Sequence, residues 1–451
     1  MKGTVACVVV VLSLAHTHGQ ELTPSAWRER DTSPRIERLR KSLANGDTNT
    51  DAFWSEIKAS GTPLIEPFGD KHSLVTFLWR GVPETRNVVV FVSDFVGVRP
   101  QDYMMRRLGN SDVWFLTVRL PPTARFLYWL SPNNPLNSAF HGGLLGSSQQ
   151  LDPLSLNPFL GIGSIAELPG APTQPWIVRN PSVPAGTVSD PQTISSKRLM
   201  KDRRVWVYIP PGYRRNGPPS DLIVLFDGRM YIDRLLAPIT LDNLIAAKRI
   251  ASTVAVFIEN PFSVRNEELF FNPTYAEFVA AELMPWIRTN FNVTKDARRV
   301  VIGGASAGGA GATYAALRHP DVFGNVLSQS AGFAFSPERM LGWAERRPGA
   351  GDGDRHIAEE IEDRSVTEGG WLAKLFIQAP KLPIRFYIDV GVFEAGFMGG
   401  GLGALEPNRH MRDVLLARGY EVHYQQFIGG HDYINWRGTF ADGMIALLGK
   451  K

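Results

Sequence analysis

The sequence is poor in cysteine and in net charge, and both shortages narrow what the protein can be. Cys7 is the single cysteine in 451 residues, so a disulfide framework is excluded. The 48 Lys and Arg residues nearly balance the 44 Asp and Glu residues, and the net charge of +4 gives no reason to expect a nucleic-acid partner. The chain also has no H-E-x-x-H motif and no Cys/His cluster, so no metal site is predicted.

The sequence has no long apolar run, and its most apolar N-terminal stretch predicts an export signal. Lys2 supplies a positive charge, and Val5 to Ala15 form an apolar run that is too short to span a bilayer. We therefore expect residues 1–19 to be a cleaved signal peptide, Cys7 to leave with it, and the mature protein to be periplasmic without stable membrane insertion. The alternative is an apolar helix that stays on the chain.

Residues 20–135 predict a leading helical segment followed by a β-rich domain. Short runs rich in Val, Phe and Leu alternate with Gly, Pro, Asn and Asp, which is typical of a small β-sandwich. The expected strands are Ser73–Trp79, Asn87–Val92, Val113–Leu120 and Ala124–Leu130. Residues 136–195 are rich in Pro, Gly, Ser and Asn and are expected to form an irregular connection, either a linker or part of a substrate lid.

Residues 196–451 alternate strand and helix patterns, which predicts a doubly wound, mostly parallel sheet of the α/β-hydrolase class. The expected strands are Arg203–Ile209, Leu222–Phe226, Val254–Ile258, Val300–Ile302, Val326–Ser328, Ile384–Val390 and Glu421–Ile428. The expected helices include Tyr275–Arg288, Ala310–Leu317, His410–Arg418 and Gly438–Leu448.

A G-x-S-x-G pattern, Gly304 to Gly308, stands between one of these strands and a helix. This is the context of a nucleophile elbow, in which a sharp turn exposes the hydroxyl of Ser306. The alternative is a Gly-rich phosphate-binding turn, but the Lys-Ser or Lys-Thr that such a loop needs does not follow the glycines.

A serine hydroxyl needs a base, and the base needs an acid that orients it. In α/β-hydrolases the order along the chain is Ser, acid, His. His431 follows a strand and precedes the last helix, so it is the predicted base. Two carboxylates qualify as the acid: Glu394, three residues after Gly391 ends a strand, is preferred, and Asp389 inside that strand remains open.

The oxyanion hole and the binding residues are less specific predictions. Backbone N–H groups of Ala307 and of the Gly228–Arg229 turn could face the developing charge, Arg229 being the preferred donor. Three further residues are candidates for substrate binding, and two of them have a structural alternative. Arg265 holds an anionic substrate or pairs with Glu268, Trp436 stacks on an aromatic ligand or belongs to the core, and Arg437 lies near His431 in sequence.

These stretches together resemble the enterochelin (enterobactin) esterases. The catalytic half carries the resemblance in Arg203–Tyr208, Leu225–Gly228, Arg265–Leu269, Gly304–Gly308, Val326–Ser330, Gly429–Asp432 and Trp436–Gly438. The N-terminal half, similar to the Ig-like first domain of that family, carries it in Phe53–Trp54, Gly61–Glu66, Val75–Phe77, Asp112–Trp114 and Asn134–Asn137.

The resemblance implies hydrolysis of the trilactone esters of a catecholate siderophore, ferric or iron-free, by Ser306, His431 and Glu394 or Asp389. Iron would then belong to the substrate, so no protein cofactor is implied. The familiar cytoplasmic members have no signal peptide, and Ala305 and Ala307 replace bulkier residues common in the family, so the substrate can differ. The rival hypotheses are an exported esterase or acyltransferase acting on other esters and a non-catalytic siderophore-binding module.

Overall fold

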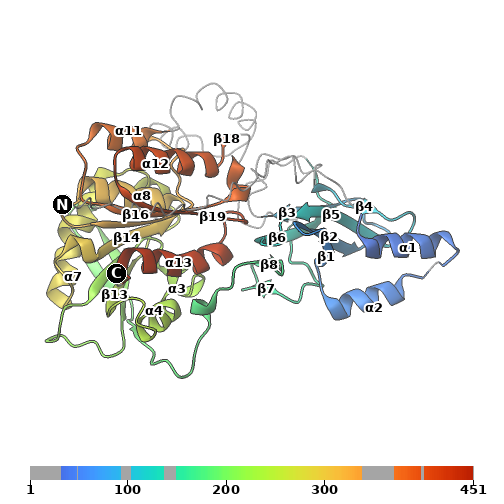
Figure 1. Ribbon diagram of the computed structural model, residues 1–451, viewed down its shortest axis with the longest axis horizontal. Coiled ribbons are helices and arrows are strands. Elements are labelled where there is room, and N and C mark those ends of the chain that lie inside the picture. The colour runs from blue at the N-terminus through green and yellow to red at the C-terminus, as the bar shows by residue number, and fades with distance from the viewer. Residues whose placement is uncertain are drawn as a thin grey trace, which may run out of the picture.

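A β-sandwich and an α/β domain lie side by side in the computed structural model (Figure 1). The structure describes residues 32–47, 49–92, 103–136, 149–337, 370–397 and 401–449. The predicted signal peptide, residues 1–19, lies outside these residues. Within the described ranges no helix is long and apolar enough to cross a membrane.

The N-terminal half begins with two helices that cover one end of the sandwich (Figure 1). Ser33 caps the first helix, since its hydroxyl accepts the backbone N–H groups of Arg35 and Ile36. The helices are α1 (Pro34–Ala44) and α2 (Asp51–Ser60). The first sheet has the order β1-β2-β5-β4, formed by β1 (Leu64–Phe68), β2 (His72–Arg80), β5 (Val113–Leu120) and β4 (Arg106–Arg107). The second has the order β3-β6-β8-β7, formed by β3 (Val88–Val92), β6 (Arg125–Pro132), β8 (Gly163–Glu167) and β7 (Pro158–Phe159).

The segment 136–195 is not wholly irregular, which corrects the prediction from its composition. β8 pairs antiparallel with β6, and β7 pairs with β8 at the end of the second sheet of the sandwich. Farther along, η3 (Pro175–Ile177), β9 (Thr187–Val188) and β10 (Gln192–Ser196) lead into the large sheet. The five residues of β8 contain one strongly β-forming side chain, Ile165, so their strand conformation comes from pairing with β6 rather than from local propensity.

The large sheet has the order β10-β11-β13-β12-β14-β15-β16-β19, with β9 beside β11, and it is parallel from β13 to β19. This confirms the predicted mostly parallel α/β sheet. Its central strands are almost wholly apolar because both faces are covered. The strands are β11 (Lys201–Ile209), β12 (Asp221–Leu225), β13 (Thr253–Ile258), β14 (Val300–Ala305), β15 (Asn325–Gln329), β16 (Arg385–Gly391) and β19 (Glu421–Phe427).

Helices pack on both faces of this sheet (Figure 1). In β12, Leu222 and Val224 enter one apolar cluster, and Ile223 and Leu225 enter the other. One face carries α5 (Arg265–Leu269), α6 (Pro273–Phe278), the π-helical turn Val279–Leu283, α7 (Met284–Asn290), α8 (Ala307–Arg318), α11 (Trp371–Gln378) and α12 (Leu405–Ala417). The other carries α3 (Gly228–Asp233), α4 (Ala237–Ala246) and α13 (Tyr433–Leu448). Short elements complete the fold: η5 (Ala297–Arg299), η6 (Val392–Ala395), β17 (Gly396–Phe397) and β18 (Gly401–Leu402).

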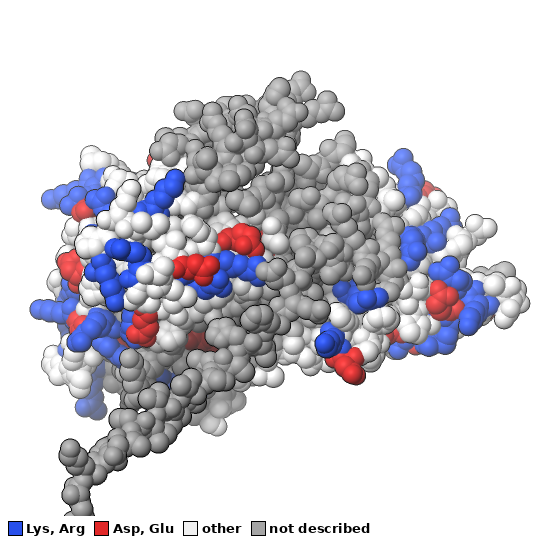
Figure 2. All heavy atoms as spheres, turned by 45° about the horizontal axis from the view of Figure 1, so that its top comes forward, with Lys and Arg blue, Asp and Glu red and all other residues white. Residues whose placement is uncertain are grey.

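Charged side chains are mixed in sign on the face shown in Figure 2, where Lys and Arg are interspersed with Asp and Glu at both ends of the molecule. This agrees with the near-balance of charge in the sequence.

Candidate active site

The candidate site lies at the carboxyl edge of the large sheet, where four neighbouring parallel strands end. Ala305, Gln329, Asp389 and Gln425 occupy adjacent register positions on β14, β15, β16 and β19. The loops that follow carry Ser306, Ser330, Glu394 and His431. In open parallel sheets this edge is where ligands bind.

Ser306 has the backbone conformation of a nucleophile elbow. Its φ of 59° and ψ of −122° lie in a region that non-glycine residues rarely adopt. The backbone N–H of Ser306 donates to the carbonyl of Gln329 at 2.8 Å, which holds the turn against β15. Gly304 permits the tight crossing, since a Cβ there would lie 2.5 Å from the carbonyl carbon of Gly308.

Glu394, rather than Asp389, is the carboxylate that the structure places against His431. His431 Nδ1 lies 2.8 Å from Glu394 Oε2. The other oxygen, Oε1, accepts hydrogen bonds from Ser330 Oγ at 2.6 Å and from the Gly391 N–H at 2.7 Å. Glu394 sits in η6, which follows β16, and its carboxylate is therefore fixed by donors from two strand ends.

Burial sets the ionisation of this pair. It raises the pKa of Glu394, and the hydrogen bonds from Ser330 and Gly391 oppose that shift because they stabilise the carboxylate. Burial also lowers the pKa of His431, so the imidazole is neutral at neutral pH. A neutral imidazole with one nitrogen directed at a carboxylate can take a proton on its other nitrogen.

Trp436 supports the pair from the core. Its side chain is 3% exposed, and its ring packs edge-on against the His431 imidazole with centroids 4.7 Å apart. The indole Nε1–H donates to Ser330 Oγ at 2.9 Å. Of the two alternatives for this residue, the structure favours the core position over stacking on a ligand. Ser330 itself, at φ 44°, was not predicted, although its place at the end of β15 was a signal for it.

Asp389 lies beneath the site in β16 and is fully buried. Gln329 Nε2 donates to its Oδ2 at 3.3 Å, and the same amide nitrogen donates to the carbonyl of Trp436 at 2.9 Å. Burial raises the pKa of Asp389 to about 7. Asp389 is thus a member of a buried polar network that joins β15, β16 and α13.

The predicted oxyanion loop lies close to the elbow. Asp227 adopts a left-handed conformation at the N-cap of α3, and a Cβ on Gly228 would lie 2.6 Å from the Phe257 backbone. A Cβ on Gly308 would lie 3.3 Å from Asp227 Oδ2, so the first turns of α3 and α8 adjoin. Arg229 and Ala307 both stand in such first turns, whose N–H groups have no acceptor within the helix.

Arg265 pairs with Asp227, not with Glu268 as one alternative proposed. Its Nε and Nη2 lie 2.7 and 2.8 Å from the two Asp227 carboxylate oxygens, and Nη2 lies 3.5 Å from the carbonyl of Ala305. Glu268 instead pairs with Arg203 and with Lys201. Arg265 therefore ties the candidate oxyanion loop to the end of the elbow strand.

Arg437 lies at the junction of the two halves of the chain. Its Nε donates to Gln174 Oε1 at 2.9 Å, and its guanidinium lies 5.8 Å from the centroid of the Phe159 ring. Arg229 directs its side chain elsewhere, pairing with Asp233 at 2.6 Å.

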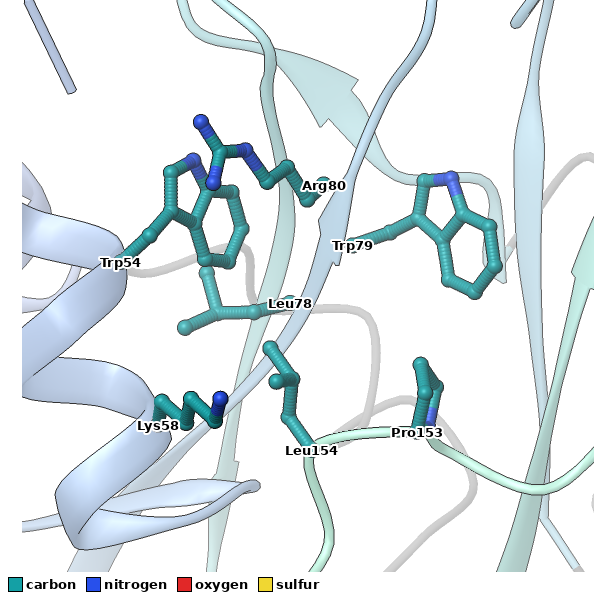
Figure 3. A pocket seen from close by; sticks show the side chains of 7 residues that line it. All are labelled: Trp54, Lys58, Leu78, Trp79, Arg80, Pro153 and Leu154. Carbon is teal, nitrogen blue, oxygen red and sulfur yellow. The ribbon is translucent and has the colours of Figure 1, made fainter. Parts of the chain in front are cut away.

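A separate pocket of about 170 Å³ lies in the N-terminal half (Figure 3). It is lined by Trp54, Lys58, Leu78, Trp79, Arg80, Pro153 and Leu154, none of which is a candidate site residue. No cluster of His, Cys, Asp or Glu that could hold a metal ion occurs in the described part of the chain.

Comparison with known proteins identifies related esterases for both halves of the chain. Residues 196–447, more than half of the chain, match the family described as "Putative esterase", and residues 74–177 match the N-terminal domain of enterochelin esterase. The chain is 29% identical over 435 residues to the iron(III) salmochelin esterase of Escherichia coli O6:H1, covering 92% of this chain and 98% of the relative. It is 27% identical over 411 residues to the iron(III) enterobactin esterase of Escherichia coli K12, covering 85% and 94%.

Solved structures share the fold across both halves of the chain. The enterobactin esterase of Shigella flexneri, crystallised in the presence of enterobactin, gives a TM-score of 0.63 at 25% identity, covering 88% of this chain and 97% of that one. The ferric enterobactin esterase of Salmonella typhimurium gives 0.65 at 24% identity, covering 88% and 98%. With an esterase domain over residues 196–447 and an enterochelin-type domain before it, the chain belongs to the enterochelin esterase family.

Proposed function

We propose that Ser306 is the nucleophile of an esterase, with His431 as its base and Glu394 as the acid that orients the imidazole. The observation that carries this proposal is the 2.8 Å contact between His431 and a buried Glu394, on the sheet edge that also presents the strained Ser306. In the first half-reaction the Ser306 oxygen bonds to the ester carbonyl carbon and its proton passes to His431.

The negative charge that develops on the carbonyl oxygen is stabilised by the N–H groups of Ala307 and Arg229. The ester C–O bond then breaks, and His431 returns its proton to the leaving alcohol. In the second half-reaction a water molecule takes the place of the alcohol, and it loses a proton to His431 as it attacks the acyl carbon. The bond between the acyl carbon and the Ser306 oxygen then breaks, His431 returns the proton to that oxygen, and the acid leaves.

The proposed substrate is the trilactone of a catecholate siderophore, in its ferric or iron-free form. Support comes from similarity to iron(III) salmochelin and enterobactin esterases along nearly their whole length, in both halves of the chain. Arg437 remains a candidate to meet the anionic catecholates. Arg265 is instead assigned a supporting role, since Asp227 already neutralises its charge.

We also infer that the enzyme works after export to the periplasm. The support is Lys2 followed by the apolar run from Val5 to Ala15. Expression of the full chain in a Gram-negative host, with cell fractionation and N-terminal sequencing, tests this inference. We expect periplasmic protein that begins near residue 20. Uncleaved protein in the cytoplasm would contradict it.

Product analysis tests the activity. Purified protein is incubated with ferric and with iron-free enterobactin, and the products are separated by chromatography. We expect linear trimer, dimer or monomer with the wild type and none with Ser306→Ala. Equal cleavage by Ser306→Ala would remove Ser306 as the nucleophile. No cleavage of either form by the wild type, with activity on simple aryl esters, would remove the proposed substrate while leaving the esterase mechanism.

A further inference from the structure

The first residues of strand β6 of the N-terminal sandwich contact both loops that carry the Glu394–His431 pair. Successive side chains of a strand point to opposite faces. Phe126 enters the core between the two sheets of the sandwich, whereas Leu127 enters an apolar cluster on the outer face. Each face receives a buried apolar residue of the catalytic domain that lies close in sequence to one member of the candidate pair.

On the inner face that residue is Phe393, which directly precedes Glu394. Its side chain is 4% exposed and belongs to the core cluster of the sandwich, not to either core of its own domain. The rings of Phe393 and Phe126 pack edge-to-face with centroids 5.9 Å apart. The Phe393 N–H donates to the Gly429 carbonyl at 3.0 Å, which joins the loop of the acid to the loop of the histidine.

On the outer face that residue is Ile434, three positions after His431. It is fully buried in one cluster with Leu127, Trp129, Phe159 and Ile165 of the sandwich. Between the two anchors, the backbone of Arg125 forms two hydrogen bonds with the catalytic domain. The Arg125 N–H donates to the Ile428 carbonyl at 2.9 Å, and Asn435 Nδ2 donates to the Arg125 carbonyl at 2.9 Å.

Asp432, the neighbour of His431, also links the catalytic domain to strand β6. Its buried carboxylate accepts the Asn435 N–H at 3.1 Å, as the N-cap of α13, and the Leu127 N–H at 3.3 Å. Gly429 leaves room for the contact, because a Cβ there would lie 2.5 Å from the Arg125 carbonyl oxygen. The Gly429–Asp432 motif is therefore shaped on one side by the sandwich.

We infer that strand β6 is a positioning element for the catalytic pair, with Phe126, Phe393 and Asp432 as positioning residues that act through Glu394 and His431. The inference rests on the proposed function only in taking His431 and Glu394 as the working pair. None of these three side chains needs to touch the substrate. Loosening them should lower kcat and leave KM nearly unchanged, since misplacing catalytic groups weakens the chemical step more than binding.

Two matched pairs of full-length variants test this inference on a small neutral aryl ester, p-nitrophenyl acetate. Phe126→Leu is compared with Phe115→Leu, which makes the same change in a buried phenylalanine of the same sandwich that packs in the cluster of the leading helices. Asp432→Asn is compared with Asp242→Asn. Asp242 is as buried as Asp432, and its carboxylate also accepts a backbone N–H, donated by Gly186 at 2.7 Å. Thermal melting of all four confirms that they are folded.

We expect kcat to fall about 10- to 100-fold in Phe126→Leu and Asp432→Asn, with KM within about twofold, and both controls to stay near the wild type. A proton NMR spectrum gives a readout that needs no turnover. The downfield resonance of the His431 imidazole N–H, identified by its loss in His431→Ala, should shift or disappear in Phe126→Leu and Asp432→Asn and persist in the controls.

The inference is overturned if Phe126→Leu and Asp432→Asn keep the kcat of their controls together with an unchanged resonance. Its failure is distinct from failure of the proposed substrate, because p-nitrophenyl acetate carries no catecholate. If the wild type does not hydrolyse the aryl ester, the resonance alone decides between the two outcomes.

Discussion

At the scale of single residues, the structure separates two carboxylates that the sequence leaves as alternatives. Glu394 and Asp389 are five positions apart, and both lie near the end of β16. Sequence spacing identifies the strand end, but it does not say which carboxylate can reach His431. That depends on the turn of η6, which brings Glu394 Oε2 to 2.8 Å from the imidazole.

Substitution of each carboxylate by its amide tests this assignment. In Glu394→Gln the side chain would present an amide N–H₂ to His431 Nδ1 and favour the wrong tautomer, so kcat should fall by about 10³- to 10⁴-fold. Asp389→Asn should stay within about threefold of the wild type, because Asp389 bonds Gln329 in the layer below. Steady-state kinetics on an aryl ester measure both, and a larger loss in Asp389→Asn would reverse the assignment.

Asp389 should instead affect how the free energy of unfolding depends on pH. Burial raises its pKa to about 7, whereas an unfolded aspartate titrates near about 3.9. Between these values the native state binds more protons than the unfolded chain, so this residue makes stability fall as pH rises. Asparagine at position 389 does not titrate, so the variant lacks this loss of stability with rising pH. The Tm of Asp389→Asn minus that of the wild type should therefore increase from pH 5 to pH 8, as calorimetry can measure. A difference that is constant with pH would contradict the raised pKa.

Side-chain partners far apart in sequence explain the remaining surprises at this scale. Arg265 pairs with Asp227, 38 positions away, and not with its near neighbour Glu268. Trp436 faces the core because Ser330 accepts its indole N–H. Neither partner can be predicted from residue spacing along the chain. Spacing shows only that a charged or aromatic residue lies near a catalytic motif, and such a residue is then interpreted as a ligand contact.

At the scale of elements, the strands and helices of the catalytic domain were predictable where their pattern was strong. The elbow strand, its sharp turn and the helix after it follow from Val300–Ile302, the G-x-S-x-G pattern and the run of alanines. Strand β8 was not predictable, since it gains its hydrogen bonds from β6 and β7 and contains few β-forming side chains.

The two elbow glycines should differ in their tolerance of a methyl group. Gly304→Ala would bring a Cβ to 2.5 Å from the Gly308 backbone, and we expect it to cost about 1–3 kcal/mol of stability through overpacking. Gly308→Ala meets only Asp227 Oδ2 at 3.3 Å and Phe226 Cβ at 3.5 Å, and alanine favours the helix by about 1 kcal/mol over glycine. Thermal melting compares the two variants, and an equal loss of Tm in both would contradict the close-crossing account of the elbow.

At the scale of the whole molecule, the two halves are joined at the candidate site. Phe393 and Ile434 of the catalytic domain are buried in apolar clusters of the sandwich. The Arg125 N–H donates to the Ile428 carbonyl in the loop before His431, and the Arg125 carbonyl accepts from the Asn435 side chain in α13. The sequence predicts a sandwich and an α/β domain but not this contact, because hydrophobic periodicity reports which residues are buried and not what buries them.

The central claim, that this esterase acts on the trilactone of a catecholate siderophore, is tested most directly by its specificity. The measurement is kcat/KM for enterobactin, ferric and iron-free, against kcat/KM for a feruloyl ester and p-nitrophenyl acetate under the same conditions. A site built for the trilactone should favour it by about 100-fold or more, since specific contacts contribute in the transition state. A kcat/KM that is equal or higher for the simple esters would contradict the claim and assign the protein to the general esterases.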